Sequence, residues 1–378
     1  MMILLIYTSQ VQVTHTITVN TPLLEVYSSL YEKYAETLTC PCTNIAIEQQ
    51  EFISLIPTFH QICHSDFVTS NWLSYLNAVS RYLLSSDFRE TGSLLFQILT
   101  SFCQLAQDAI NSSLPKFYST RFVSNHVTDI KLLNKESQSR IQLYILTTAN
   151  EFAYSFDFIR DATFLNALLS GLLTNFNFGI AGYDSYLSGY RLSQMPKSYN
   201  QSYNCDCSLT ASCVSSAAIS DNITGDVLFV IPGLYTGCQL VEAMRQSNLE
   251  CLYNQTCLNQ IHNYIQSPVS FNITALNTSV FSRYNPSTTI SQLLANLMVE
   301  SWVQNVSYSA YYHQCQPIQC TYMKIEKNEA IYIITTSIGL FGGLYKVLYF
   351  LTPIIVEIIR RRRGKVNSIV VITIRRTT

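Results

Sequence analysis

The sequence has few charged residues for its length. Charged side chains make up 12% of the 378 residues, and 23 Lys and Arg oppose 24 Asp and Glu. A net charge of −1 argues against nucleic acid as a partner, because nucleic-acid binding requires a basic face. Disorder is disfavoured too, because aromatic residues reach 12%, most of them Tyr and Phe. We therefore expect a folded chain of one large domain or two ordinary ones.

The sequence also lacks the familiar catalytic and cofactor motifs. It contains no G-x-S-x-G elbow, no H-E-x-x-H pair, no Walker loop and no Rossmann glycine pattern. Glu151, Asp157 and Asp161 lie near one another on an expected helix and could act as acid and base, but a solvated polar face explains them better. We therefore expect no enzyme activity, no catalytic residue and no cofactor.

Zinc-type cysteine spacing is absent as well, although the chain holds twelve cysteines. There is no C-x2-C pair and no paired histidines follow. His60, Cys63 and His64 form H-x-x-C-H, which lacks a nearby fourth ligand, so we interpret Cys63 as disulfide-bonded and the histidines as incidental. An even number of cysteines predicts a disulfide framework and no metal site. The candidates are Cys40, Cys42, Cys63, Cys103, Cys205, Cys207, Cys213, Cys238, Cys251, Cys257, Cys315 and Cys320.

The longest apolar run, residues 330–359, follows all twelve cysteines. About 20 apolar residues suffice for a transmembrane helix, so this run predicts a span. Four arginines begin at Arg360, and basic residues beside a span favour the cytoplasm. We therefore expect residues 360–378 to be a cytoplasmic basic tail of a plasma-membrane protein, with the body extracellular and the lipid bilayer as a partner.

N-x-[ST] sequons agree with an extracellular body, because all of them precede the apolar run. The glycosylation candidates are Asn111, Asn200, Asn222, Asn254, Asn272, Asn277 and Asn305.

The N-terminal segment leaves the route across the membrane open. Met1–Tyr7 is apolar but too short to span, and it lacks a basic start. We favour residues 1–8 as the outer end of a first span whose beginning is missing from this sequence. An unusual short signal sequence and a cytosolic body are the alternatives.

Periodicity predicts an α+β body of mixed helices and short strands. Residues 9–178 form a helix-rich part and residues 179–328 a cysteine-rich part, because Gly, Ser, Tyr and Asn become frequent near Phe178. Helices are expected at 71–84, 90–112, 140–173, 239–252 and 287–302, and strands at 11–19 and 227–232.

Small residues recur within the apolar run. Thr335, Gly339 and Gly343 repeat every four residues, a pattern that lets membrane helices approach closely. Lys346 is ionisable inside the run, and such residues usually face a partner or a water-filled path. We expect this helix to pack in a homo- or hetero-oligomer, with Pro353 kinking it.

Three short features resemble the degenerin/epithelial sodium channel family. They are Tyr7 with an extended segment leading to Thr37-Leu38-Thr39-Cys40, the membrane-proximal Cys315 and Cys320, and Gly339-Leu340-Phe341-Gly342-Gly343. The resemblance implies an ion channel subunit with Gly342 and Gly343 in the outer half of its pore helix. The chain also looks like invertebrate membrane proteins, a similarity that implies no activity.

The resemblance does not extend to the pore filter. Phe350-Leu351-Thr352 stands where that family carries G-x-S, and Lys346 places a positive charge beside the path. A second class of function therefore stays open, a cell-surface receptor or adhesion protein that binds a partner through its ectodomain.

Overall fold

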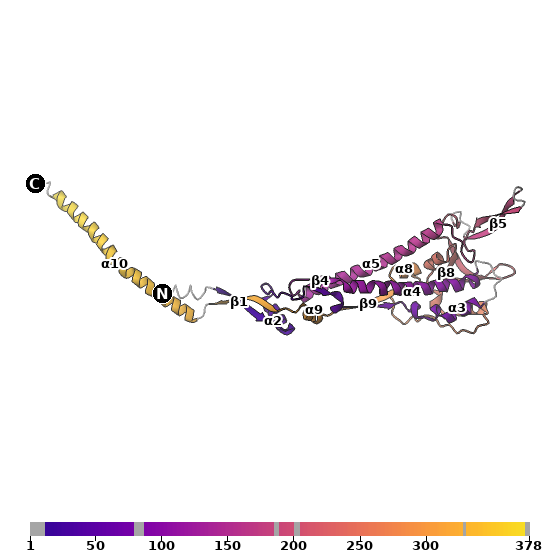
Figure 1. The fold of residues 1–378 in the computed structure, drawn as a ribbon, viewed down its shortest axis with the longest axis horizontal. Coiled ribbons are helices and arrows are strands. Elements are labelled where there is room, and N and C mark those ends of the chain that lie inside the picture. Colours follow the sequence, from indigo (N-terminus) through magenta and orange to yellow (C-terminus); the bar gives the residue numbers. More distant parts are fainter. Residues whose placement is uncertain (1–11, 79–86, 185–188, 200–204, 328–329, 375–378) are drawn as a thin grey trace. The chain divides into compact units, whose positions relative to one another are not determined.

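The computed structural model describes residues 12–78, 87–184, 189–199, 205–327 and 330–374 (Figure 1). The chain divides into two compact units that are interleaved in the sequence. Unit 1 comprises Met1–Ile45, Ser124–Val127 and Cys315–Thr378, and unit 2 comprises Ala46–Val123 and Thr128–Gln314. The expected boundary near residue 178 falls inside β5 (Phe176–Asp184), within unit 2.

The mixture of helices and strands predicted from the sequence is confirmed, with 50% helix and 23% strand in the structure as described. All five sheets in the described ranges are two-stranded and antiparallel. A single two-stranded ribbon is marginal in water by itself. The strands therefore need helices or disulfides to hold them, and both are present.

Unit 1 is built on a ribbon that joins distant parts of the sequence. β1 (Gln12–Asn20) pairs with β10 (Gln319–Lys327), from Gln12 opposite Lys327 to Asn20 opposite Gln319. The strand expected at 11–19 is thereby confirmed. α2 (Leu24–Tyr34) follows β1, and the ring of Tyr34 stacks on Tyr322 of β10 at 4.3 Å between centroids. The unit also contains α10 (Ala330–Ile374).

Unit 2 contains the other helices and strands, in the order of the chain: β2 (Ala46–Glu48), η1 (Gln49–Glu51), β3 (Ile53–Phe59), η2 (Gln61–His64), η3 (Asp66–Val68), α3 (Ser70–Asn77), α4 (Phe88–Ser119), β4 (Arg121–Val123), α5 (Ile130–Leu165), β5, β6 (Gly189–Pro196), β7 (Val214–Ser220), β8 (Val227–Gly237), α6 (Leu240–Gln246), η4 (Cys251–Tyr253), α7 (Gln255–Ile265), α8 (Ile290–Leu294), β9 (Val299–Val306) and α9 (Tyr308–Cys315, whose last residue is assigned to unit 1).

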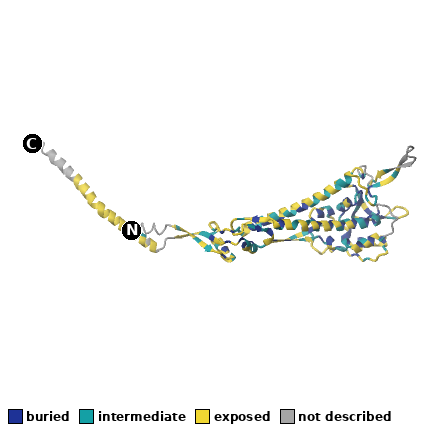
Figure 2. Ribbon diagram, viewed as in Figure 1, coloured by how far each residue is buried: buried dark blue, intermediate teal, exposed yellow. Residues whose placement is uncertain are grey.

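The core of unit 2 lies between α4 and the shorter elements around it (Figure 2). Leu95, Phe96 and Leu99 of α4 are buried there, and the Trp72 ring of α3 meets the Phe96 ring at 5.4 Å. Each such side chain contributes about 1.5–3 kcal/mol when it leaves water. The apolar spacing that predicted this helix therefore marks its buried face correctly.

α4 extends further than predicted. The expected end before Pro115 is wrong, because the helix runs through Pro115 to Ser119. Proline removes one backbone hydrogen bond, and the burial of Phe117 in the following turn offsets that loss. Asp87 caps the other end, where its Oδ1 accepts from the Arg89 N–H. α5 is shifted relative to the prediction, because it begins at Ile130 rather than 140 and ends at Leu165 rather than 173.

The prediction of a helix at 287–302 is correct for only part of that range. α8 covers only Ile290–Leu294, and Leu297 and Met298 then take positive φ angles of 57° and 54°. Those two residues turn the chain into β9, where Trp302 pairs opposite Pro57 of β3. Pairing with a strand about 245 residues away overrides local helical periodicity. The helix expected at 239–252 is likewise shorter, as α6 ends at Gln246.

The strand expected at 227–232 is confirmed, but its apolar residues are mostly exposed. β8 begins at Val227 and continues to Gly237, and Val227, Leu228 and Val230 are exposed. Only Ile231 of that stretch is fully buried. A two-stranded ribbon buries one face at most, so a continuous apolar run does not become a buried strand here.

Candidate functional site

One helix in the described part of the chain is long and apolar enough to cross a membrane. It is α10, with a 29-residue candidate span at Ile334–Arg362. No residue of that window is buried against the rest of the chain, as the exposed surface in Figure 2 shows. The helix continues through the arginines to Ile374. An apolar helix left uncovered by its own chain requires lipid or other helices around it.

The small residues of α10 form a shallow groove on this uncovered helix. Gly339 and Gly343 line it together with Thr336 and Leu340. An added Cβ at Gly339, Gly342 or Gly343 meets no atom within 4 Å. The Thr335 hydroxyl is already satisfied, because it donates to the Ile331 carbonyl at 2.9 Å. The glycines are therefore not required by contacts within this chain, which leaves their face open for another helix.

Lys346 shares the face of the small residues. At about 100° per residue, Thr335, Gly339 and Gly342 all lie within about 40° of Lys346 around the helix axis. Gly343 lies about 60° away by the same arithmetic. The side opposite Lys346 carries Leu348, Leu351 and Ile355. The sequence pattern and the helix therefore bring the predicted packing residues and the ionisable residue to one side.

The depth of Lys346 places its charge near the middle of the span. A rise of 1.5 Å per residue puts it about 21 Å from Arg360 and about 18 Å from Ile334 along the axis. Glu357, the acidic residue of α10, pairs with Arg361 at 2.7 Å. Within the described ranges, no carboxylate lies at ion-pair distance from Lys346 Nζ. The charge at mid-span has no counter-ion from its own helix.

All twelve cysteines are bonded in six disulfides, as the sequence predicted. The members of each C-x-C pair reach different partners. The pairs are Cys40–Cys320, Cys42–Cys315, Cys63–Cys103, Cys205–Cys213, Cys207–Cys238 and Cys251–Cys257.

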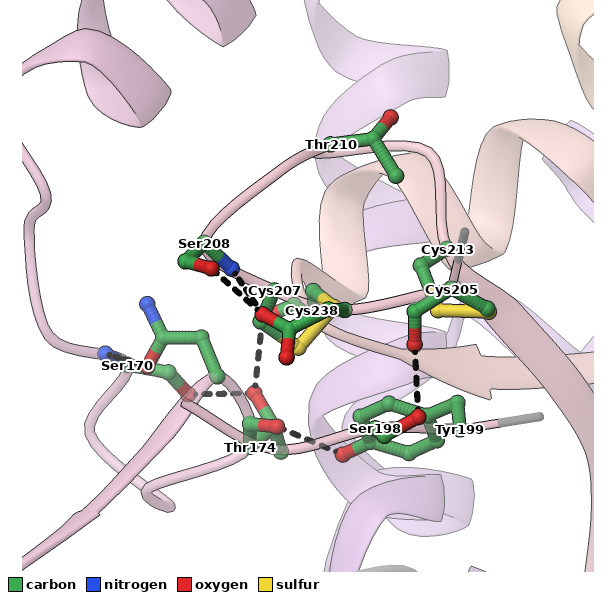
Figure 3. Close-up of a disulfide and its surroundings, with 12 residues drawn as sticks. Ser170, Thr174, Ser198, Tyr199, Cys205, Cys207, Ser208, Thr210, Cys213 and Cys238 are labelled. Carbon is green, nitrogen blue, oxygen red and sulfur yellow. Dashed lines mark hydrogen bonds between the residues drawn. A yellow bond between two sulfur atoms is a disulfide. The ribbon is translucent and has the colours of Figure 1, made fainter. Parts of the chain in front are cut away.

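Two of these bridges, Cys205–Cys213 and Cys207–Cys238, cluster beside Tyr199 (Figure 3). The Tyr199 hydroxyl donates to the Thr174 carbonyl at 2.7 Å, and burial raises the pKa of this phenol to about 12. The Thr174 hydroxyl bonds to the Cys238 carbonyl. The hydroxyls of Tyr199 and Thr174 are therefore uncharged and hydrogen-bonded. The two bridges attach β7 and β8 to the segment that contains Cys205 and Cys207.

The sequon asparagines of the described part are all exposed. Asn111 lies on α4, Asn305 on β9, and the remaining four (Asn222, Asn254, Asn272 and Asn277) in loops or at an element end. Asn254 caps α7 with Oδ1, which accepts from the Thr256 and Cys257 N–H groups. Asn200 lies outside the described residues. Exposure allows a glycan at each described site, and glycosylation itself stays a prediction.

The carboxylates considered as acid and base are held mainly in ion pairs. Asp157 contacts both Arg160 at 3.3 Å and Arg245 at 3.0 Å, and Asp161 contacts Arg160 at 2.8 Å. The Arg160 guanidinium, through its hydrogen bond, lowers the pKa of Asp161. Ionised, paired carboxylates at a helix surface are typical of structural contacts.

The sequence did not reveal the buried position of His60. Its side chain is 1% exposed, and its Nδ1 accepts from the Ile62 N–H at 3.1 Å. The ring proton is therefore on Nε2, which faces the Tyr253 hydroxyl at 3.3 Å and Glu300 Oε1 at 3.5 Å. Burial lowers the pKa of His60, and the opposing attraction of Glu300 is smaller. Neutral His60 joins the end of β3 to β9.

We expect acid to destabilise unit 2 through His60. The folded pKa lies below the unfolded value of 6.5, so the unfolded chain binds the proton first and stability falls as pH drops below 6.5. His60→Asn keeps an acceptor for the Ile62 N–H and cannot titrate in this range. The drop in melting temperature between pH 7.5 and pH 5.5 should therefore be smaller in this variant. An equal drop in both proteins would show that other groups carry the pH dependence.

Comparisons with known proteins found no matching family model, no matching curated protein and no matching solved structure.

Proposed function

We propose that this protein is a subunit of an oligomeric ion channel in the plasma membrane, with a glycosylated extracellular body and residues 360–378 in the cytoplasm. In each subunit, α10 faces the other copies through Thr335, Gly339, Gly342 and Lys346. The disulfides fit this location, since such bridges persist in oxidising compartments.

The single observation that carries the proposal is the position of Lys346 on the small-residue face. A lysine at the centre of a helix in the bilayer costs roughly 2.5–3.5 kcal/mol on insertion scales. The cost falls when the residue faces a water-filled path instead of lipid. Leucine and isoleucine on the opposite side of α10 suit lipid. A bundle of α10 helices with this face inward satisfies both requirements.

The β1–β10 ribbon supports the expected first span beside α10. Gln12 pairs directly with Lys327, so the segment before β1 and the segment leading to α10 start within about 5 Å of each other. A first span that led directly into β1 would therefore be joined to the body close to the point where the chain leaves it for α10. Two neighbouring helices per subunit can line a wider pore than one helix per subunit.

The charge on this face favours anions. Rings of lysine or arginine select anions in pores, just as rings of carboxylates select cations. The arginines from Arg360 would raise the anion concentration at the cytoplasmic mouth. The family resemblance implies sodium conduction, whereas Lys346 favours chloride or another small anion.

Current recordings with a chloride gradient test the proposal. Wild type and Lys346→Arg should reverse near the chloride equilibrium potential, whereas Lys346→Glu should shift the reversal potential towards that of the cation. The arginine variant controls for size and for surface expression. A wild-type reversal potential that follows sodium, or one that Lys346→Glu leaves unchanged, would contradict a lysine-lined anion path.

A second candidate is a receptor or adhesion protein, favoured by an exposed apolar face on α5. Leu143, Tyr154, Phe158 and Leu165 are all exposed and lie within about 60° of one another around the helix. Apolar side chains gathered on one side often mark a partner site. Surface-expressed wild-type protein that carries no current would favour this candidate.

A further inference from the structure

An open cavity with a mainly apolar lining lies between the C-terminal half of α4 and the middle of α5, with Gln49 of η1 among its lining residues. Its volume is about 410 Å³, within the usual range for small-molecule sites. Lys116 and Phe117 contribute from α4, and Arg140 and Tyr144 from α5. The residues come entirely from unit 2. The cavity is therefore independent of α10 and of the channel proposal.

Gln49 contributes a buried, unpaired polar atom to the lining of the cavity. Its side chain is 1% exposed, yet its Oε1 atom has no hydrogen-bond partner among the described residues. Buried carbonyl oxygens are nearly always paired. The backbone N–H of Gln49 donates to the Thr120 carbonyl at 3.0 Å, which anchors η1 to the end of α4. The free oxygen calls for a donor from outside the chain.

Two cations lie at the same end of the cavity. Antiparallel packing puts Lys116 beside the Arg140 end of α5, because Phe117 contacts Tyr144 at 4.8 Å between ring centroids. The Arg140 guanidinium sits 5.5 Å from the centre of the Phe122 ring, which holds its position. Neither cation has an ion-pair partner in the described ranges. Their charges are available to an anionic group.

The remaining lining limits the shape of the ligand. Phe117, Leu143 and Tyr144 provide an apolar wall next to the cations. The lining also includes the Glu151 carboxylate, which lies about 16 Å along α5 from Arg140, so an anionic group is favoured only at the Arg140 end. The Tyr144 hydroxyl is already bonded to Ser113 at 3.0 Å, so the ring contributes mainly surface. A ligand therefore needs an anionic group, a hydrogen-bond donor close to it and an apolar body.

We propose that this cavity binds an α-carboxylate with an N–H donor on the adjacent carbon, as in a free amino acid or the C-terminus of a short peptide. The carboxylate pairs with Lys116 and Arg140. The neighbouring N–H donates to Gln49 Oε1, and the side chain lies against Phe117 and Leu143. Bidentate pairing of arginine with a carboxylate gives the site its orientation.

Titration calorimetry on the full chain in detergent tests the site with four probes. L-phenylalanine should bind, whereas phenylalaninamide (no carboxylate) and 3-phenylpropionate (no N–H) should bind at least tenfold more weakly. N-acetyl-phenylalanine separates the two sources, because a site for peptide C-termini accepts it and a site for free amino acids does not. No binding of either L-phenylalanine or its acetyl form would overturn the proposal.

Two variants test which side chain binds the carboxylate and which binds the N–H group of the ligand. Arg140→Gln should weaken L-phenylalanine at least tenfold, with Lys135→Gln, exposed elsewhere on α5, as the control that leaves binding unchanged. Gln49→Met should remove the preference for L-phenylalanine over 3-phenylpropionate while the protein stays folded. Retention of that preference in Gln49→Met, or equal effects of Arg140→Gln and Lys135→Gln, would overturn the assignment. Failure of this site leaves the channel proposal untouched, since neither variant changes α10.

Discussion

Gly339→Leu and Gly343→Leu are expected to weaken assembly of the proposed membrane oligomer at least tenfold. Each leucine adds a side chain to the face on which Thr335 and Lys346 lie, and this holds two helix backbones apart. The isolated helix tolerates both changes, because an added Cβ meets no neighbour at either glycine. Leucine is also a better helix former than glycine. Cross-linking and native gels of surface-expressed protein measure the effect.

Ser337→Leu is the matched control for these variants. It makes a similar increase in size on the same helix, but about 160° from Gly339 around the axis. Lipid accepts leucine at that position, so the oligomer should persist. Leu340 and Leu344 are poorer control positions, because both line the groove next to the glycines. Unchanged assembly in both glycine variants would show that Gly339 and Gly343 do not pack against another helix. The receptor candidate would then be favoured.

The second large effect is expected from the paired bridges of unit 1. Cys40–Cys320 and Cys42–Cys315 span sequence separations of 280 and 273 residues. In the loop-entropy description, the first bridge to form contributes about 5–6 kcal/mol. The second then closes a loop of only about nine residues and contributes about 3 kcal/mol. Either bridge alone therefore keeps most of the stabilisation.

Replacing the cysteines by alanine should reveal this redundancy. Loss of one bridge should lower the free energy of unfolding by about 3 kcal/mol, and loss of both by about 8 kcal/mol, more than the sum of the single effects. Urea unfolding of the full chain in detergent, followed by limited proteolysis, measures the differences. Removal of Cys251–Cys257, which spans 6 residues, should instead add to either single loss. Simple additivity of the two unit 1 bridges would refute their shared loop.

Local features of the chain were predictable from the sequence. The amphipathic faces of α4 and the apolar length of α10 follow from spacing along one segment, as do the β-branched residues of β1. The small-residue face of α10 is of the same kind, because helical geometry alone brings Gly339 and Lys346 to one side. An even cysteine set before an apolar run likewise indicated oxidised bridges. Each of these inferences uses residues only a few positions apart, or composition.

Tertiary structure decided everything that joins distant segments. The partners of Cys40 and Cys42, the pairing of β1 with β10 and the conversion of 299–302 from helix to strand depend on contacts across more than 200 residues. The burial of His60 against Glu300 and the presence of Gln49 and Arg140 in the lining of one cavity arise in the same way. Periodicity records only which face of a segment is apolar. Which other segment covers that face depends on the packing of the whole chain, because many pairings bury similar apolar area and only their combined geometry selects one.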